Sequence, residues 1–126
     1  MKPRCSEADI ERTVTEFLQL DGWRAIHTDP CSDRRRAKGF GELGMADHLY
    51  IRYKWLHPPL CDKEHFRPVS EVLWIEFKAP GKKPEPHQAR WHDAERLRGA
   101  LVMVVDDIDK FTEWYKSSGL CRRILT

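Results

Sequence analysis

Apolar side chains recur along the chain with a helical period in three segments, and each segment predicts a helix. The first stripe consists of Ile10, Val14, Phe17 and Leu18, which repeat at helical spacing. Ser6 is a suitable N-cap for this helix, and Asp21-Gly22 is a suitable end. Two further helices are expected at residues 86–98 and 108–116.

Alternating or continuous apolar runs predict strands between these helices. They are expected at residues 23–28, 47–55, 71–78 and 101–105. We expect residues 29–45 to form a loop and residues 56–70 an extended connection, while the tail at 120–126 is either a short edge strand or frayed. The order helix, three strands, helix, strand, helix is typical of an α/β fold with a small central sheet covered by helices.

Length and composition place the chain among ordinary globular proteins. Its 126 residues suit one domain, expected to span 1–126, and no apolar run approaches a membrane span. The start of the chain shows no secretory signal, which favours a cytoplasmic protein, and no membrane partner is expected. The four cysteines are widely spaced and form no CxxC pair, so neither a disulfide framework nor a cysteine-bound zinc is expected.

Positive charge is concentrated in two segments although the formal net charge is only +2. The first segment holds Arg34, Arg35, Arg36 and Lys38, and the second holds Lys78, Lys82 and Lys83. Solvated loops are the simpler interpretation of both. If the partner is a nucleic acid, however, these residues are well placed to contact phosphates.

An acidic residue interrupts the clearest strand. Glu76 and Lys78 point to the same face because side chains alternate along a strand, and Glu76 shares this face with the apolar Trp74. A buried carboxylate is costly unless it is paired or binds a metal. Glu76 therefore either forms an ion pair with Lys78 near the strand end or belongs to a metal site.

Two further acids stand where they can join Glu76. Asp47 opens the preceding strand, although a turn residue is also common there. Glu7 lies within roughly 40° of the centre of the first helical stripe and Glu11 within roughly 80°, so Glu7 is expected to face the sheet. Its alternative role is that of a favourable acid at a helix N-terminus.

These positions suit magnesium chemistry. Mg²⁺ prefers oxygen ligands from one or two carboxylates, which Asp47 and Glu76 can supply from adjacent strands, with Glu7 as an outer or second-metal ligand. Lys78 would then contact the attacking water or the scissile phosphate.

Two segments carry a resemblance to a known family. Residues 44–47 read Gly-Met-Ala-Asp and residues 75–81 read Ile-Glu-Phe-Lys-Ala-Pro-Gly. Together they resemble the PD-(D/E)XK nuclease signature and, more narrowly, that of the virus-type replication-repair nuclease (VRR-NUC) domain. The likeness covers about residues 6–115, with a gap at 56–70. It departs from the family at Ala46, where proline is usual, and in the length of the 56–70 insertion.

The resemblance implies a restriction-endonuclease-like core with a small mixed sheet, and it assigns roles to several residues. Asp47, Glu76 and the backbone carbonyl of Phe77 become ligands of Mg²⁺ or Mn²⁺, and Lys78 becomes the catalytic lysine. Glu7 matches the family's acid in the first helix. Gln88 matches its glutamine in the second helix, which is expected to order the site or touch DNA.

The activity implied by the resemblance is that of a metal-dependent, structure-selective DNA endonuclease. Stand-alone members are similar to Holliday-junction resolvases, so branched DNA such as a four-way junction and a homodimer are expected. Two alternatives stay open: a nuclease of the same fold for flap, nicked or single-stranded DNA, and a non-catalytic DNA-binding module on a nuclease scaffold.

The remaining histidines and tryptophans have plainer interpretations. His48 follows Asp47, but strand alternation sends it to the opposite face, where packing is expected. His87 and His92 are expected on the surface of the second helix. Trp74 and Trp91 are expected to pack in the core rather than to stack on bases.

Overall fold

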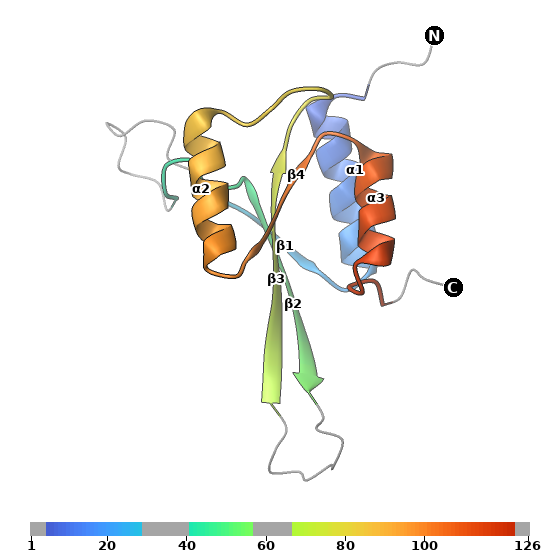
Figure 1. Cartoon of the computed structure of the whole chain (residues 1–126). Coiled ribbons are helices and arrows are strands. Elements are labelled where there is room, and N and C mark those ends of the chain that lie inside the picture. The colour runs from blue at the N-terminus through green and yellow to red at the C-terminus, as the bar shows by residue number, and fades with distance from the viewer. Residues whose placement is uncertain (1–4, 29–40, 57–66, 123–126) are drawn as a thin grey trace.

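The computed structural model describes residues 5–28, 41–56 and 67–122, which form a sheet with helices on both faces (Figure 1). The elements are α1 (Glu7–Leu20), β1 (Arg24–His27), β2 (His48–Leu56), β3 (Arg67–Phe77), α2 (Pro86–Leu97), β4 (Leu101–Val105) and α3 (Ile108–Ser117). This order confirms the α/β prediction. The arginine triplet 34–36 and Lys38 lie outside the described residues. No helix in the described ranges combines the length and apolar character needed to cross a membrane.

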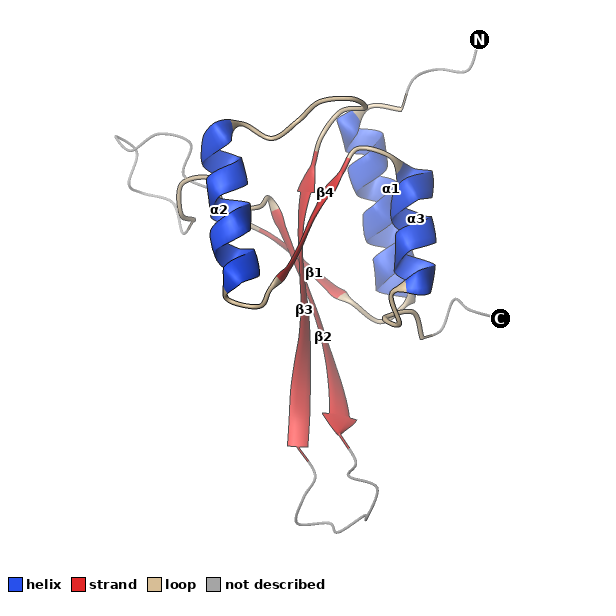
Figure 2. Cartoon of the chain, viewed as in Figure 1, coloured by secondary structure: helices blue, strands red, loops and turns tan. Residues whose placement is uncertain are grey.

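The sheet is mixed, in the order β1-β2-β3-β4. The first three strands are antiparallel, and β4 pairs with β3 in parallel after the α2 crossover. Figure 2 shows α1 and α3 on one face of the sheet and α2 on the other. This arrangement is compatible with the expected restriction-endonuclease-like core.

The connection expected at residues 56–70 is shorter than predicted. β2 continues to Leu56 and β3 already begins at Arg67, and Leu56 and Arg67 are paired, so the two strands form a long hairpin that extends away from the helices (Figure 1). Pro68 falls within the expected connection, but it lies in a part of β3 that pairs with β2 and with no other described strand. A strand with one free edge tolerates proline, which explains the error. At the other end of the chain, residues 120–122 form no strand.

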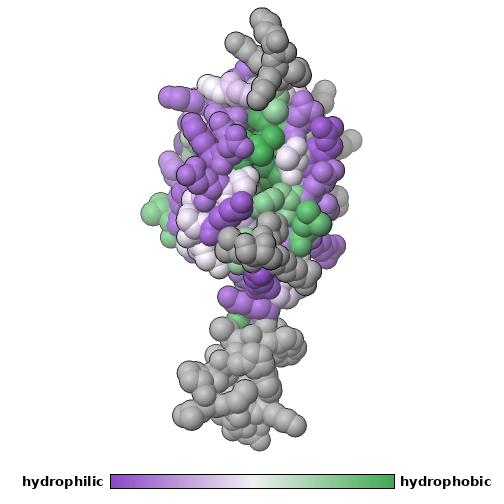
Figure 3. Space-filling view, turned by 90° about the vertical axis from the view of Figure 1, so that its right-hand side faces the viewer, coloured by the Kyte–Doolittle hydropathy of each residue, from purple (hydrophilic) through white to green (hydrophobic). Residues whose placement is uncertain are grey.

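The main core lies between the sheet and the pair α1 and α3. Ser6 caps α1 and forms a capping box with Asp9, as the sequence predicts for the cap. Buried residues of α1, β3 and α3 then meet in one cluster, whose fully buried members include Ile10, Leu18, Leu73, Ile75 and Tyr115. Seen from the side of these two helices, the surface is mostly hydrophilic with a narrow apolar band (Figure 3).

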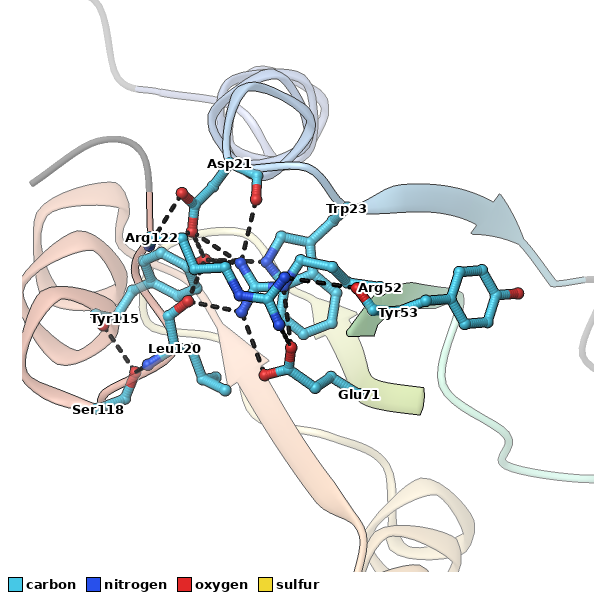
Figure 4. A network of polar contacts seen from close by, with 9 residues as sticks. All are labelled: Asp21, Trp23, Arg52, Tyr53, Glu71, Tyr115, Ser118, Leu120 and Arg122. Atoms are coloured by element: carbon cyan, nitrogen blue, oxygen red, sulfur yellow. Dashed lines mark hydrogen bonds and ion pairs between the residues drawn. The ribbon is translucent and has the colours of Figure 1, made fainter. Parts of the chain in front are cut away.

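The buried guanidinium of Arg52 connects several elements near the C-terminal end of α1 (Figure 4). Arg52 is 3% exposed and donates hydrogen bonds to Asp21 Oδ2 at 3.0 Å and to Glu71 Oε2 at 3.1 Å. It also donates to the Leu120 carbonyl at 2.6 Å and lies 4.4 Å from the centre of the Trp23 ring. One side chain of β2 therefore connects the end of α1, β3 and the segment after α3.

Arg52→Ala is expected to lower the free energy of unfolding by about 3–5 kcal/mol, because it removes the buried guanidinium that bonds to the Asp21 and Glu71 carboxylates and to the Leu120 carbonyl. Urea denaturation measures this loss. The matched control is Arg12→Ala, since the Arg12 side chain is 66% exposed in its ion pair with Asp9. This control should cost less than about 1 kcal/mol. Equal losses in the two variants would contradict the structural role of Arg52.

Candidate functional site

The pairing of β2 with β3 brings two of the predicted acids opposite each other. His48 pairs with Ile75, so the preceding Asp47 stands opposite the following Glu76. Both side chains belong to the face that α2 covers. The Asp47 backbone is held by a hydrogen bond from the Thr28 amide to its carbonyl at 2.8 Å. Lys78 follows on the same face, and its amide bonds to the Val105 carbonyl at 3.0 Å.

The Glu76 carboxyl is completely buried, and no described N–H or O–H group donates to its oxygens with regular hydrogen-bond geometry, although the Asp47 amide and carboxyl lie close to it. Burial and the neighbouring Asp47 carboxyl together raise the pKa of Glu76 to about 9, although the Lys78 ammonium partly opposes the shift. A hydrogen bond between the two carboxyl groups requires that one of them holds a proton. The pair can therefore share a proton or, when both are ionised, bind a cation.

The donor set fits a hard divalent cation. Glu76 contributes two unpartnered oxygens and Asp47 faces the same space, which matches the preference of Mg²⁺ for carboxylate oxygens. An ion at this position would offset the cost of the buried Glu76 carboxylate beside the half-buried Asp47. The identity of the ion and the Phe77 carbonyl ligand stay predictions.

His92 completes the buried polar group, although the sequence interpretation placed it on the surface of α2. That expectation is wrong: His92 is 1% exposed, and its Nε2 lies 3.8 Å from Glu76 Oε1. Burial lowers the pKa of His92, so the imidazole is neutral near pH 7. One signal was available in the sequence, since Gln88 and His92 are separated by one helical turn and share a face.

Gln88 makes a local contact at the start of α2. It is half-buried, and its Oε1 accepts the Glu85 amide at 2.8 Å, which closes a capping box at the start of α2. Gln88 therefore orders the N-terminus of the helix that covers Glu76. Its contact with DNA stays a prediction.

The first-helix acid is not where the helical phase predicted. Glu7 is exposed, whereas Glu11 is half-buried and its Oε1 lies 2.9 Å from His48 Nε2. The expectation that Glu7 rather than Glu11 faces the sheet is wrong, because His48 stands opposite Glu11 while the first helical turn is open to solvent. The role of Glu7 as a ligand stays a prediction. Lys82 and Lys83 are exposed just after β3.

The segment that leads to Asp47 packs directly on α2. Gly44 has a φ of 81°, and a Cβ at this position would lie 2.3 Å from the His87 carbonyl oxygen. Glu42 Oε2 accepts a hydrogen bond from the Trp91 indole at 2.9 Å. Trp91 also meets Trp74 edge-on at 5.0 Å, which confirms the packing role predicted for both rings. The helix thus covers Glu76 and holds the loop that delivers Asp47.

A second group of metal-binding side chains lies on the opposite face of the sheet. His48 is buried there, as strand alternation predicts for the residue after Asp47. One ligand atom from each of Glu11, His27 and His48 lies within 4.8 Å of the other two. Sequence reasoning missed this group because its members are distant along the chain and show no ligand spacing.

Comparison with known proteins points to a nuclease. The chain is 36% identical over 62 residues to a protein of Acyrthosiphon pisum secondary endosymbiont phage 1 that is described as "Putative nuclease p44". The aligned segment covers 47% of this chain and 67% of the phage protein. No family model and no solved structure matches the chain.

The raised pKa of Glu76 predicts how stability changes with pH in the absence of metal. A carboxyl that titrates at 4.5 when unfolded and at about 9 when folded binds more protons in the folded state. The free energy of unfolding should therefore fall as the pH rises between these two values. Thermal melts in EDTA measure this slope. In Glu76→Gln the slope should be smaller than in the parent; an unchanged slope would contradict the shift.

The contact between Gly44 and α2 predicts a difference between two glycine variants. Gly44 and Gly81 both have a φ of 81°, but a Cβ on Gly81 meets nothing within 4 Å. Gly81→Ala should therefore cost only the backbone penalty, about 1–2 kcal/mol. Gly44→Ala should cost more, because its methyl group meets backbone atoms. Urea denaturation of both variants measures the difference, and equal costs would refute the close contact.

Proposed function

Since the chain belongs to the family of the phage protein described as "Putative nuclease p44", we propose that it is a metal-dependent DNA endonuclease of the VRR-NUC type. The observation that carries this proposal is the buried, unpartnered carboxylate of Glu76, which faces Asp47 and has Lys78 beside it. A buried acid with a strongly shifted pKa and a second carboxylate opposite is typical of a functional site and suits a hydrolytic metal centre.

Asp47, Glu76 and the Phe77 carbonyl would hold the ion, which we propose is Mg²⁺ or Mn²⁺. Such an ion stabilises negative charge on the phosphate and makes bound water easier to deprotonate. With the ion in place, both carboxylates are ionised. Glu7 is retained as a candidate outer ligand, although its exposed side chain would have to turn toward the site.

The protein's own side chains have separate tasks around this centre. The Lys78 ammonium lies near enough to Glu76 to lower its pKa, and it can donate a hydrogen bond to a phosphate oxygen or to the attacking water. His92 can donate from Nε2 to Glu76 Oε1 after a small approach from 3.8 Å, which would orient the carboxylate. Because α2 covers the face that carries Asp47 and Glu76, it would limit the access of water to this side of the site.

The proposed substrate is branched DNA, in particular a four-way junction cut by a homodimer. Support comes from the sequence likeness to stand-alone nuclease domains that are similar to junction resolvases. Lys82 and Lys83 are exposed directly after the strand that bears Glu76 and Lys78, where they can contact the phosphates that flank the cut. The basic residues 34–36 and Lys38 precede the Asp47 strand and are proposed to extend this contact.

Cleavage of labelled DNA tests the proposal. Purified protein with Mg²⁺ or Mn²⁺ should cut four-way junctions faster than flaps, nicked duplex, single strands or intact duplex. Asp47→Asn and Lys78→Ala should each lower the rate by about 10²-fold or more, because each removes charge stabilisation in the transition state. Native mass measurement should show a dimer.

The matched control is Lys116→Ala, which removes an exposed lysine from the last turn of α3 on the other side of the sheet. It should leave cleavage unchanged. Binding of the junction in EDTA should survive in all variants. If the parent binds DNA but cuts none of the substrates with either metal, the chain is a binding module and the nuclease proposal fails. Faster cutting of flaps than of four-way junctions would reject only the proposed preference for junctions.

A further inference from the structure

Three elements bring metal-binding side chains together at the sheet edge formed by β1. Glu11 comes from the middle of α1, His27 ends β1, and His48 begins β2. His27 and His48 are register partners, and their ring centres are 4.7 Å apart. His48 Nε2 lies 2.9 Å from Glu11 Oε1, and all three ligand atoms fall within 4.8 Å of one another.

The group reaches from the core to the solvent-exposed surface. The three side chains line a cavity of about 500 Å³, together with neighbours that include Arg12, Thr15 and Glu16. The His48 side chain is 7% exposed and the Glu11 side chain 39%, while His27 is exposed. An ion can therefore enter from solvent and reach a ligand that is fixed in the core.

We propose that Glu11, His27 and His48 bind a divalent transition-metal ion of the zinc class, at a site separate from Asp47 and Glu76. Two imidazoles and one carboxylate form a donor set that suits zinc and its transition-metal neighbours, whereas Mg²⁺ prefers oxygen ligands throughout. Zinc at bond lengths of about 2.0–2.1 Å places tetrahedral ligand atoms roughly 3.3 Å apart. The 2.9 Å between His48 Nε2 and Glu11 Oε1 is near this value, and with all three atoms within 4.8 Å of one another, side-chain rotation would complete the site. Three protein ligands would leave one position of a tetrahedral zinc site for water.

An ordinary hydrogen bond from His48 to Glu11 is the simpler explanation for the buried contact. That bond needs no third side chain, whereas a metal site needs His27. His27 is exposed at the end of its strand, so replacing it should not disturb the core. It is the residue that separates the two explanations.

Metal binding here would have a structural consequence. The ion would connect α1 to the edge strand and to the start of β2, where His48 directly follows Asp47. Since a ligand that binds only the folded state stabilises it by mass action, zinc should raise the melting temperature of the whole chain. The parent should show this shift, and His27→Ala should lose it.

Calorimetric titration of ZnCl₂ into the EDTA-treated, desalted full chain tests the proposal. The parent should bind zinc stoichiometrically, and Co²⁺ at the same site should show the visible absorption of a tetrahedral complex. His27→Ala and Glu11→Gln should each weaken zinc binding by more than about tenfold, as loss of a ligand contact does. Near-UV circular dichroism verifies that both variants remain folded.

Two carboxylate variants serve as matched controls. Glu16→Gln changes an acid in the same cavity outside the group, and Glu76→Gln changes the acid on the other face; both should retain the parent affinity. Unchanged affinity in His27→Ala, or loss of binding in Glu76→Gln, would overturn the assignment. No DNA cleavage is needed as a readout, so this test stands whether or not the proposed nuclease activity is found.

Discussion

The register between β2 and β3 is the constraint on which the candidate site depends. Arg52 stands opposite Glu71 in this register, and their side chains form a nearly buried ion pair at 3.1 Å. The same register sets Asp47 opposite Glu76 at the other end of the strands. A slip by one residue would turn the side chains of β2 to the other face, which would separate the two acids and bury Asp47 against α1. The ion pair therefore helps to specify the carboxylate pair.

The buried environment that makes an ionised Glu76 unfavourable for folding is also what would make it a strong ligand in the proposed metal site. Packing of Trp91 on Trp74 and the burial of His92 remove water from the α2 face. Without a cation this desolvation raises the pKa of Glu76 to about 9 and weakens the fold as the pH rises. With a cation the same low-dielectric surroundings strengthen its attraction to the carboxylates. The free-energy cost of burying Glu76 at the candidate site is offset by the well-packed core on the other face of the sheet.

Strand alternation gives the start of β2 two chemically distinct sides. Asp47 belongs to the α2 face with Glu76, and His48 belongs to the α1 face with Glu11 and His27. Oxygen donors on one side and imidazoles on the other favour different ions. The proposed zinc-class site would thus stabilise the strand that delivers Asp47 without sharing a ligand with the proposed catalytic centre.

The period of the apolar residues was enough to predict the type and order of the helices and strands and to place Glu76 and Lys78 on one face. Contacts between distant segments set Glu11 rather than Glu7 against the sheet, buried His92 beside Glu76 and extended β2 and β3 into a long hairpin. The physical reason is that periodicity reports which side of an element can turn inward. Burial and pairing also depend on what stands opposite, and the packing of distant segments decides that.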